Sequence, residues 1–361
     1  MKYNNITGSI NRVSLAIYDD LIQSYVEEVK QIQGVKSIIQ IGSFTAPGLS
    51  DIDIIVIVDD ENPPKWQEIS IIKILKDKEG YEVIAHDVFV YPESLADYIE
   101  GLFYLDRKKV LFGNDIGGKL SEKKIDKLKL VLTFEYTIHR LETLVVLTSL
   151  PSVNIRDILL FISTLRHTYK LLHDFNIISI NERDKRVNQI EELRTLSIDN
   201  GKEEFREKLN EWIIPSFKAI YESAILIGEK LNYKNSDHIK KWILNDNKLI
   251  FNVDSAKEAT DFFISNNKLN SLIKAKALIE PMPSSVYSHV LNYKQIGDKN
   301  EFNFDNIDIP SLRYYLAKEH SKFINNNNYP IAKSYIILSN EPRRIQARVK
   351  RVFLIFYSFF R

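Results

Sequence analysis

Two aspartates separated by one residue, Asp51 and Asp53, stand at the head of an apolar run that is otherwise suited to burial, Ile54 to Val58. Because side chains alternate along a strand, both carboxylates should lie on one face, about 7 Å apart. Such carboxylates repel each other and lose hydration when buried. A divalent cation reverses that cost, and hard oxygen ligands suit Mg²⁺ or Mn²⁺. We therefore predict a metal site at Asp51 and Asp53.

A glycine-serine pair, Gly42-Ser43, precedes the two acids and follows the β-branched run Val35 to Ile41. Glycine lets the backbone approach a ligand closely, and backbone N–H groups with the Ser43 hydroxyl can hold phosphate oxygens. Phosphoryl and nucleotidyl transfer need such a cradle beside metal-binding acids, because metal ions clamp the attacking and leaving oxygens. The pattern favours nucleotide binding by Gly42 and Ser43; otherwise Ser43 is a turn or helix-cap serine.

A third carboxylate is expected from a neighbouring strand. Asp87 lies inside the run from Tyr81 to Tyr91, whose β-branched and aromatic residues predict a strand. There it would bridge to a metal and act as general base on an acceptor hydroxyl. On a regular strand His86 faces the opposite way and is interpreted as structural, and Glu82 is an alternative third acid whose position has the wrong parity.

The chain resembles the nucleotidyltransferase superfamily of DNA polymerase beta in three motifs: Gly42-Ser43, Ser50-Asp51-Ile52-Asp53 and the later Asp87. Within it, the chain is most similar to small prokaryotic proteins of kanamycin-nucleotidyltransferase type, and Val110 to Ile116 resembles the segment that closes such domains. The resemblance covers roughly residues 10–118. It implies that Asp51, Asp53 and Asp87 are catalytic and hold the metal, while Gly42 and Ser43 bind the nucleotide. The linker lacks the arginine that many relatives carry between these motifs, so phosphate contacts are fewer or come from elsewhere.

By this resemblance, the expected reaction is transfer of a nucleoside monophosphate from an NTP to an acceptor hydroxyl, with release of pyrophosphate. The enzyme is expected to depend on Mg²⁺ (or Mn²⁺) and to use ATP. A small-molecule acceptor is favoured by analogy, although a protein side chain and an RNA end fit the same chemistry. The alternative is a nucleotide-binding regulatory protein, or a toxin/antitoxin-type protein that acts on tRNA or a protein partner. The sequence leaves the acceptor, the NTP preference and the oligomeric state open.

Local patterns predict the elements that position these residues. Residues 1–118 should form a helix over 11–33, strands over 35–41, 51–58 and 81–91, and a helix over 66–78. Further helices are predicted over 125–150, 155–175 with Asn154 as N-cap, and 203–232, kinked or broken at Pro215. The predicted fold is an α/β (α+β) nucleotidyltransferase domain with a mixed sheet (1–118), a mainly α-helical domain (119–280) and a mixed, basic C-terminal region (281–361).

The distribution of charge, the absence of cysteine and the length of the apolar runs limit what kind of protein this is. The 361 residues carry 49 Lys+Arg and 48 Asp+Glu, but residues 1–118 hold 11 basic and 19 acidic residues, so the remainder is basic. This asymmetry indicates that the two parts meet different partners. Cysteine is absent, which excludes disulfides and thiolate chemistry and fits the cytoplasmic location that we expect. No apolar run reaches the ~18 residues that span a bilayer, so we expect no transmembrane segment.

Three further patterns have alternative interpretations. Arg166 and His173 have an Arg-x6-His spacing that loosely resembles the ribonuclease motif of helical domains accompanying small nucleotidyltransferases; the alternative is an ordinary helix edge. His139 and Arg140 are interpreted as helix-surface residues. The basic, aromatic tail at 342–361 is interpreted as a terminal helix docked on the core, and the alternatives are contact with nucleic-acid phosphates or with an anionic membrane surface.

Overall fold

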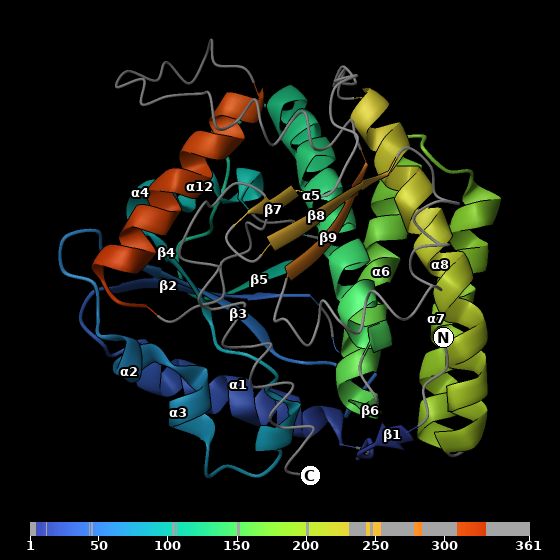
Figure 1. Ribbon diagram of the computed structural model, residues 1–361. Coiled ribbons are helices and arrows are strands. Elements are labelled where there is room, and N and C mark those ends of the chain that lie inside the picture. Colours follow the sequence, from blue (N-terminus) through green and yellow to red (C-terminus); the bar gives the residue numbers. More distant parts are fainter. Residues whose placement is uncertain are drawn as a thin grey trace. The chain divides into compact units, whose positions relative to one another are not determined.

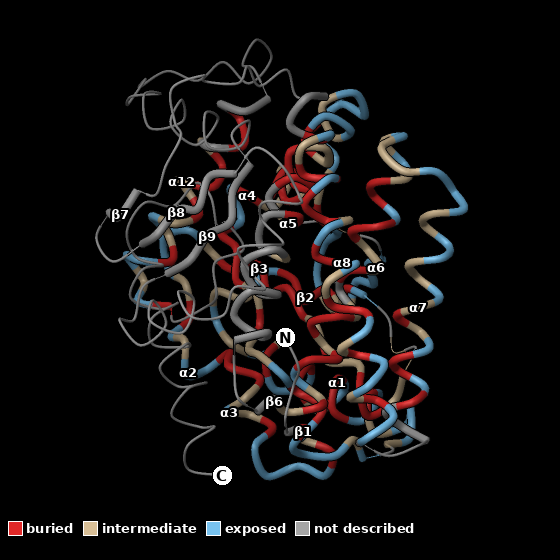
Figure 2. The backbone as a smooth tube through the Cα atoms, turned by 45° about the vertical axis from the view of Figure 1, so that its right-hand side comes forward, coloured by how far each residue is buried: buried red, intermediate tan, exposed pale blue. Residues whose placement is uncertain are grey.

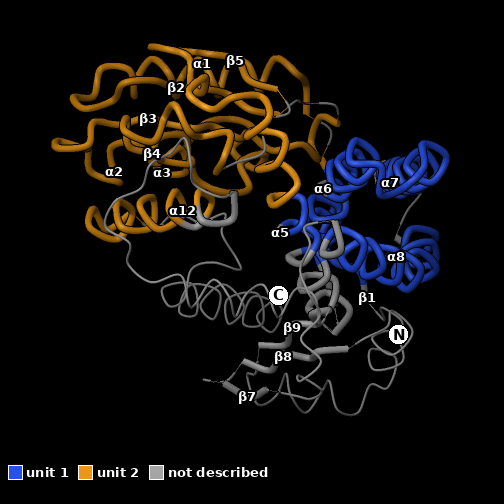
Figure 3. Tube along the Cα trace, turned by 90° about the horizontal axis from the view of Figure 1, so that it is seen from above, with its two compact units in different colours: residues 1–10, 133–301, 347–361 blue, residues 11–132, 302–346 orange. Residues whose placement is uncertain are grey.

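The computed structural model describes residues 5–11, 13–42, 44, 46–102, 105, 107–149, 152–199, 202–230, 243–245, 248–253, 278–283 and 309–329. The chain divides into two compact units (Figure 3). Residues 11–132 and 302–346 form one, called the sheet unit; residues 1–10, 133–301 and 347–361 form the other, called the helical unit. The domain boundaries expected at 118 and 280 stay a prediction. Ser43 and the basic tail at 342–361 lie outside the described residues.

The sheet unit is built on a four-stranded mixed sheet in the order β4-β3-β2-β5 (Figure 1). Its strands are β2 (Val35–Ile41), β3 (Asp53–Val58), β4 (Phe89–Pro92) and β5 (Lys108–Gly113). Strands β3 and β5 run antiparallel to β2, whereas β4 runs parallel to β3. This arrangement confirms the expected α+β class and the mixed sheet.

Strand β3 forms the centre of the core. Every side chain from Ile54 to Val58 is buried, because the strand has neighbours on both edges and is covered on both faces. Its register pairs Asp53 with Ile41, the last residue of β2. Asp53 is therefore the first residue of β3 and is only partly buried, which places this carboxylate at the end of the sheet.

Helix α1 (Leu15–Val29) lies with α2 (Trp66–Ile69) and α3 (Ile71–Leu75) along one side of the sheet (Figure 1). Buried and exposed stretches alternate along α1 (Figure 2), because its apolar residues recur at helical spacing. Its buried Tyr18, Leu21, Tyr25 and Val29 join one core cluster with residues of β3. The Tyr25 hydroxyl donates to the Ile69 carbonyl at 2.7 Å and ties α1 to α2.

Helix α12 (Ile309–Asn326) returns to the sheet unit and packs against β4, which is the edge strand beside β3. His320 Nε2 lies 2.7 Å from the Val90 carbonyl oxygen, and its ring stacks on Tyr91 with centroids 4.2 Å apart. The buried Arg313 donates to the Gly101 carbonyl at 3.1 Å. The contact from His320 gives a partner to one backbone carbonyl of an edge strand, and exposed groups on such a strand are open to pairing with another chain.

The helical unit is formed mainly by α5 (Glu122–Ser149), whose first turns belong to the sheet unit, and by α6 (Ile155–Asp174), α7 (Ile180–Asp199) and α8 (Lys202–Lys230). The predicted N-cap is confirmed: Asn154 Oδ1 accepts from the Arg156 N–H at 2.9 Å. Helix α8 continues through Pro215, so the chain is not broken there, and the kink that was the other expectation stays a prediction. The unit also contains two small sheets. Strand β1 (Asn5–Thr7) pairs with β6 (Ser152–Asn154), and a three-stranded sheet has the order β7 (Ile243–Asn245), β8 (Lys248–Val253) and β9 (Leu278–Pro283).

The strand predicted over 81–91 is confirmed only at its end, from Phe89 to Tyr91. Residues Tyr81–Val83 form a 3₁₀ turn, and the strand begins only at Phe89. Residues 84–88 between them are not in a strand, His86 lies at a bend, and Asp87 accepts from the N–H groups of Ile71 and Val88. The helix predicted over 66–78 is likewise divided at Ser70 into α2 and α3. Among the described residues, no helix is both long enough and apolar enough to cross a membrane.

Candidate metal site

Asp51, Asp53 and His86 bring three ligand atoms together at the end of the sheet. Asp53 opens β3, Asp51 comes two residues earlier, and His86 lies in the segment before β4. The His86 Nε2 atom is 2.8 Å from Asp53 Oδ1 and 3.5 Å from Asp51 Oδ2. One ligand atom from each residue lies within 4.8 Å of the others, so the cluster can hold a metal ion. The three side chains are between 24% and 30% exposed, which leaves the cluster accessible from solvent.

The His86 ring is held by contacts on both nitrogens and on its face. Nδ1 lies 2.7 Å from the Asp87 carbonyl oxygen, and Nε2 points at the two aspartates. The Phe89 ring lies 4.9 Å from the imidazole, centroid to centroid. A histidine that donates one N–H to a backbone carbonyl and presents the other nitrogen to a cluster of anions has the arrangement of a metal ligand.

The charges around His86 favour its protonated form in the absence of a cation. Burial lowers the pKa of the imidazole, but the hydrogen bond to Asp53 and the charges of Asp53 and Asp51 outweigh it and raise the pKa to about 9. An imidazolium therefore compensates the two carboxylates in the metal-free protein. Because a metal ion needs the same nitrogen in its neutral form, the proton and the metal compete for one position.

The carboxylate of Asp87, which the resemblance implies is a metal ligand, is hydrogen-bonded to Ser70 and to backbone N–H groups. Its Oδ2 accepts from the Ser70 hydroxyl at 2.7 Å, and its Oδ1 accepts from the N–H groups of Ile71 at 2.9 Å and Val88 at 3.0 Å. The side chain thus satisfies donors at the start of α3. Burial raises the pKa of this carboxyl, and the same hydrogen bonds oppose the rise. The structure brings Asp51 and Asp53 together with His86, whereas the carboxylate of Asp87 faces Ser70 and the backbone; Glu82 lies in the 3₁₀ turn.

Gly42 lies directly beside the cluster. Its backbone has φ = +77°, which glycine adopts without strain, and a Cβ built on it would lie 3.6 Å from Asp53 Oδ2. The Gly42 N–H donates to the Arg107 carbonyl at 3.1 Å. The proximity to Asp53 therefore comes from the turn, and the N–H of Gly42 has a protein partner already.

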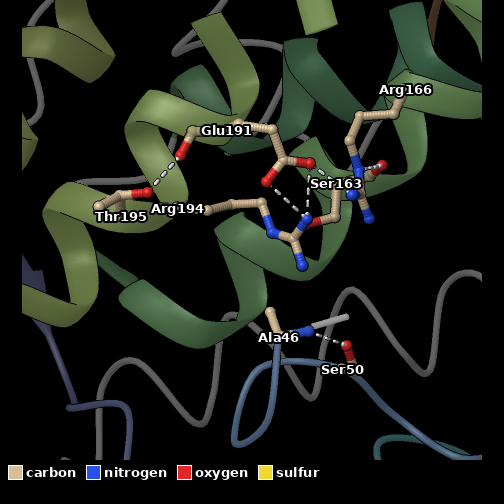
Figure 4. A network of polar contacts seen from close by, with 7 residues as sticks. All are labelled: Ala46, Ser50, Ser163, Arg166, Glu191, Arg194 and Thr195. Carbon is tan, nitrogen blue, oxygen red and sulfur yellow. Dashed lines mark hydrogen bonds and ion pairs between the residues drawn. The ribbon is translucent and has the colours of Figure 1, made fainter. Parts of the chain in front are cut away.

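The rest of the loop is folded onto α1. The Tyr18 hydroxyl donates to the Ser50 carbonyl at 2.7 Å and accepts from the Gly48 N–H at 3.0 Å. The Ala46 N–H donates to the Ser50 hydroxyl at 3.2 Å (Figure 4), and the N–H groups of Leu49 and Ser50 donate to the Ala46 carbonyl. These N–H groups hold the loop that carries Asp51, so phosphate contacts predicted for the loop would need other donors.

Arg166 on α6 has structural partners in the helical unit. Its Nη1 lies 2.5 Å from Glu191 Oε1, and its Nε donates to the Ser163 carbonyl at 3.1 Å (Figure 4). The buried Arg194 contacts the same Glu191 at 2.9 Å. His173 Nδ1 lies 3.5 Å from the Ile178 carbonyl oxygen. The contacts of Arg166 therefore join α6 to α7, as expected of a helix edge.

Arg140 is not the helix-surface residue that its sequence context predicts. Its guanidinium carbon lies 5.8 Å from the centre of the Tyr136 ring and 5.4 Å from that of Phe161. Burial lowers the pKa of this arginine to about 10, and among the described residues its buried Nε has no hydrogen-bond partner. Stacking on aromatic faces compensates a buried guanidinium in part. The side chain of His139 lies outside the described residues.

Comparison with known proteins identifies no relative, since no family model, no curated protein and no solved structure matches the chain. The function is therefore argued from the chemistry of the site.

His86 is the group that sequence reasoning missed. The interpretation of His86 as structural assumed a regular strand, in which neighbours face opposite ways. A chain that turns at residues 84–88 removes that constraint. The one usable signal was the imidazole itself, next to a predicted ligand and able to bind a metal at neutral pH.

Proposed function

We propose that the protein is a metal-dependent nucleotidyltransferase that transfers a nucleoside monophosphate from an NTP to an acceptor hydroxyl. The observation that carries the proposal is the convergence of Asp51, Asp53 and His86 within 4.8 Å, open to solvent, at the end of the sheet where a glycine turn precedes two acids. The motifs from Gly42 to Asp53 and their resemblance to nucleotidyltransferases support nucleotide chemistry over other metal chemistry.

In the proposed reaction, the acceptor oxygen attacks the α-phosphorus of the NTP. The bond from that phosphorus to the bridging oxygen breaks, pyrophosphate leaves, and the hydroxyl proton passes to a base or to water. Asp51 and Asp53 hold the cation that neutralises the phosphate oxygens. Since hydrogen bonds engage both carboxylate oxygens of Asp87, we assign Asp87 the role of positioning His86 through its carbonyl. A small molecule stays the favoured acceptor, and ATP the expected NTP.

The experiment that tests the proposal is calorimetric binding of the four NTPs, each with and without Mg²⁺ or Mn²⁺. The variants are Asp51→Asn/Asp53→Asn and a control, Asp97→Asn, which removes an aspartate from an exposed ion pair with Lys119 in the same unit. We expect at least one NTP to bind only with metal, to the wild type and the control but not to the double variant. Binding that ignores both the metal and the double substitution contradicts the proposal.

A second assay separates transfer from binding alone. An NTP labelled at the α-phosphate is incubated with the protein, metal and panels of hydroxyl-bearing small molecules, RNA and protein. Label joined to an acceptor, with pyrophosphate released in equal amount, is the expected result. Tight metal-dependent NTP binding with no transfer to any panel favours instead a nucleotide-binding regulatory protein.

A further inference from the structure

The third group of the cluster is an imidazole, whereas the sequence motifs imply a third carboxylate. Ligands of a small divalent cation lie about 2.1 Å from the metal, so neighbouring ligand atoms in an octahedral shell are about 3 Å apart. The separations from His86 Nε2 to Asp53 Oδ1 and to Asp51 Oδ2, 2.8 Å and 3.5 Å, bracket that value. The imidazole therefore already lies at the spacing that it needs to share one ion with each aspartate, and all three ligand atoms lie within 4.8 Å of one another.

The orientation of His86 is fixed by the fold. The Asp87 carbonyl that lies 2.7 Å from Nδ1 belongs to a residue whose own side chain holds Ser70, Ile71 and Val88. Donation from Nδ1–H to that carbonyl leaves Nε2 to face the carboxylates. An outer partner of this kind selects the tautomer and makes the imidazole a better ligand.

We infer that this site selects a first-row transition-metal dication, such as Mn²⁺ or Co²⁺, over Mg²⁺, and that His86 is the residue that sets the preference. The inference rests on the proposed metal-dependent function and names its cofactor class. Mg²⁺ prefers an all-oxygen octahedral shell and keeps several waters. Imidazole nitrogen is a softer ligand that suits transition metals, so one nitrogen and two carboxylate oxygens bind Mg²⁺ less well than three carboxylates.

The preference is tested by isothermal titration of the metal-free protein with Mn²⁺, Co²⁺ and Mg²⁺ in one buffer. Because most N/O sites bind transition metals more tightly than Mg²⁺, the decisive quantity is the ratio of affinities and its change in variants. The His86→Asp variant has three carboxylate ligands and no imidazole. In it we expect the Mn²⁺/Mg²⁺ affinity ratio to fall about tenfold or more. His173→Gln, a histidine that also lies near a backbone carbonyl, is the control and should leave the ratio unchanged.

A spectroscopic measurement on the wild type tests the same inference without needing a variant that folds. Bound Mn²⁺ studied by electron spin echo should show modulation from one directly coordinated imidazole ¹⁴N, and His86→Gln should lose it. An unchanged affinity ratio in folded His86→Asp, or Mn²⁺ bound without nitrogen coupling, overturns the inference while metal-dependent NTP binding stands. If no divalent metal binds at all, the proposed function fails with it.

Discussion

An aspartate lies at each end of strand β3, and the two carboxylates have different partners. Asp59 follows the last residue of β3; its carboxylate lies 2.9 Å from Lys36 Nζ and accepts from the N–H groups of Glu61 at 3.0 Å and Asn62 at 2.9 Å. Asp53, at the first residue, lies 2.8 Å from the titratable His86 and shares it with Asp51. At one end a single carboxylate has a lysine and two N–H donors, and at the other end two carboxylates lie around one imidazole.

The glycines at the ends of β2 show the same contrast. Gly34 accepts from the Asp59 N–H, and a Cβ on it would lie 2.3 Å from the Asn62 carbonyl oxygen. Gly42, at the other end, has space for a Cβ. The Asp59 end is thus closed by packing and fixed donors, whereas the Asp53 end has space at Gly42 and two carboxylates around one imidazole. This difference separates a carboxylate that stabilises a turn from a carboxylate that is placed to bind.

The largest expected effect is on metal affinity, when the aspartate at each end of β3 is replaced in turn by asparagine. Asp53→Asn should weaken binding of a transition-metal dication by about 1,000-fold, because loss of an outer partner alone costs about 10–100-fold. Asp59→Asn should leave the metal affinity unchanged and lower the free energy of unfolding, since Lys36 and two N–H groups lose their charged partner. Metal titration and urea unfolding of both variants check the pair; equal metal affinity in the two variants contradicts the comparison.

The next largest effect is expected on the free energy of unfolding, when Gly34 and Gly42 are each replaced by alanine. Gly34→Ala should lower the free energy of unfolding by about 3 kcal/mol, because the left-handed backbone is strained for alanine and the Asn62 carbonyl must move. Gly42→Ala, with φ = +77° but no close contact, should cost only about 1 kcal/mol. Urea unfolding of both proteins tests the difference. A Gly42→Ala variant that unfolds as easily as Gly34→Ala would show that the Asp53 end is as tightly built as the other.

Asp87→Ala tests whether the third predicted acid stabilises α3 or binds metal. Loss of its hydrogen bonds to Ser70, Ile71 and Val88 should lower the free energy of unfolding by about 1 to 2 kcal/mol. The metal affinity should fall no more than about tenfold, because Asp87 holds His86 through a backbone carbonyl that alanine retains. If the metal affinity falls as far as in Asp53→Asn, Asp87 is a ligand and its hydrogen bonds rearrange when metal binds.

The features that the sequence predicted well depend on neighbours in the chain. The β-branched runs of β2 and most of β3, the helical spacing of α1 and the Asn154 cap are local patterns. So is the spacing of Asp51 and Asp53, which needs only a turn and the start of a strand.

The features that it predicted poorly depend on distant contacts. Asp87 accepts from Ser70 and Ile71, which are 17 and 16 residues away, and His86, the residue before it, reaches the aspartates from a bend. Helix α12 covers β4 through His320, which is 230 residues from its partner Val90. A pattern of alternating residues carries no information on such pairs, so the imidazole ligand and the covering of β4 became apparent only in the fold.

The smallest effect is the pH dependence of stability that comes from Asp59 in acid. The hydrogen bond from Lys36, with those from the N–H groups of Asn62 and Glu61, lowers the pKa of Asp59 from 3.8 to about 2. A carboxyl with a lowered pKa in the folded state stabilises the fold above its unfolded pKa, and that contribution is lost as the pH falls from 3.8 through 2. The wild type should therefore lose stability over this range more steeply than Asp59→Asn, as measured by urea midpoints at successive pH values. Lys36→Met should remove only part of the slope, because the two N–H groups remain; a slope that vanishes entirely would mean that the lysine alone, and not the turn, holds this end of β3 closed.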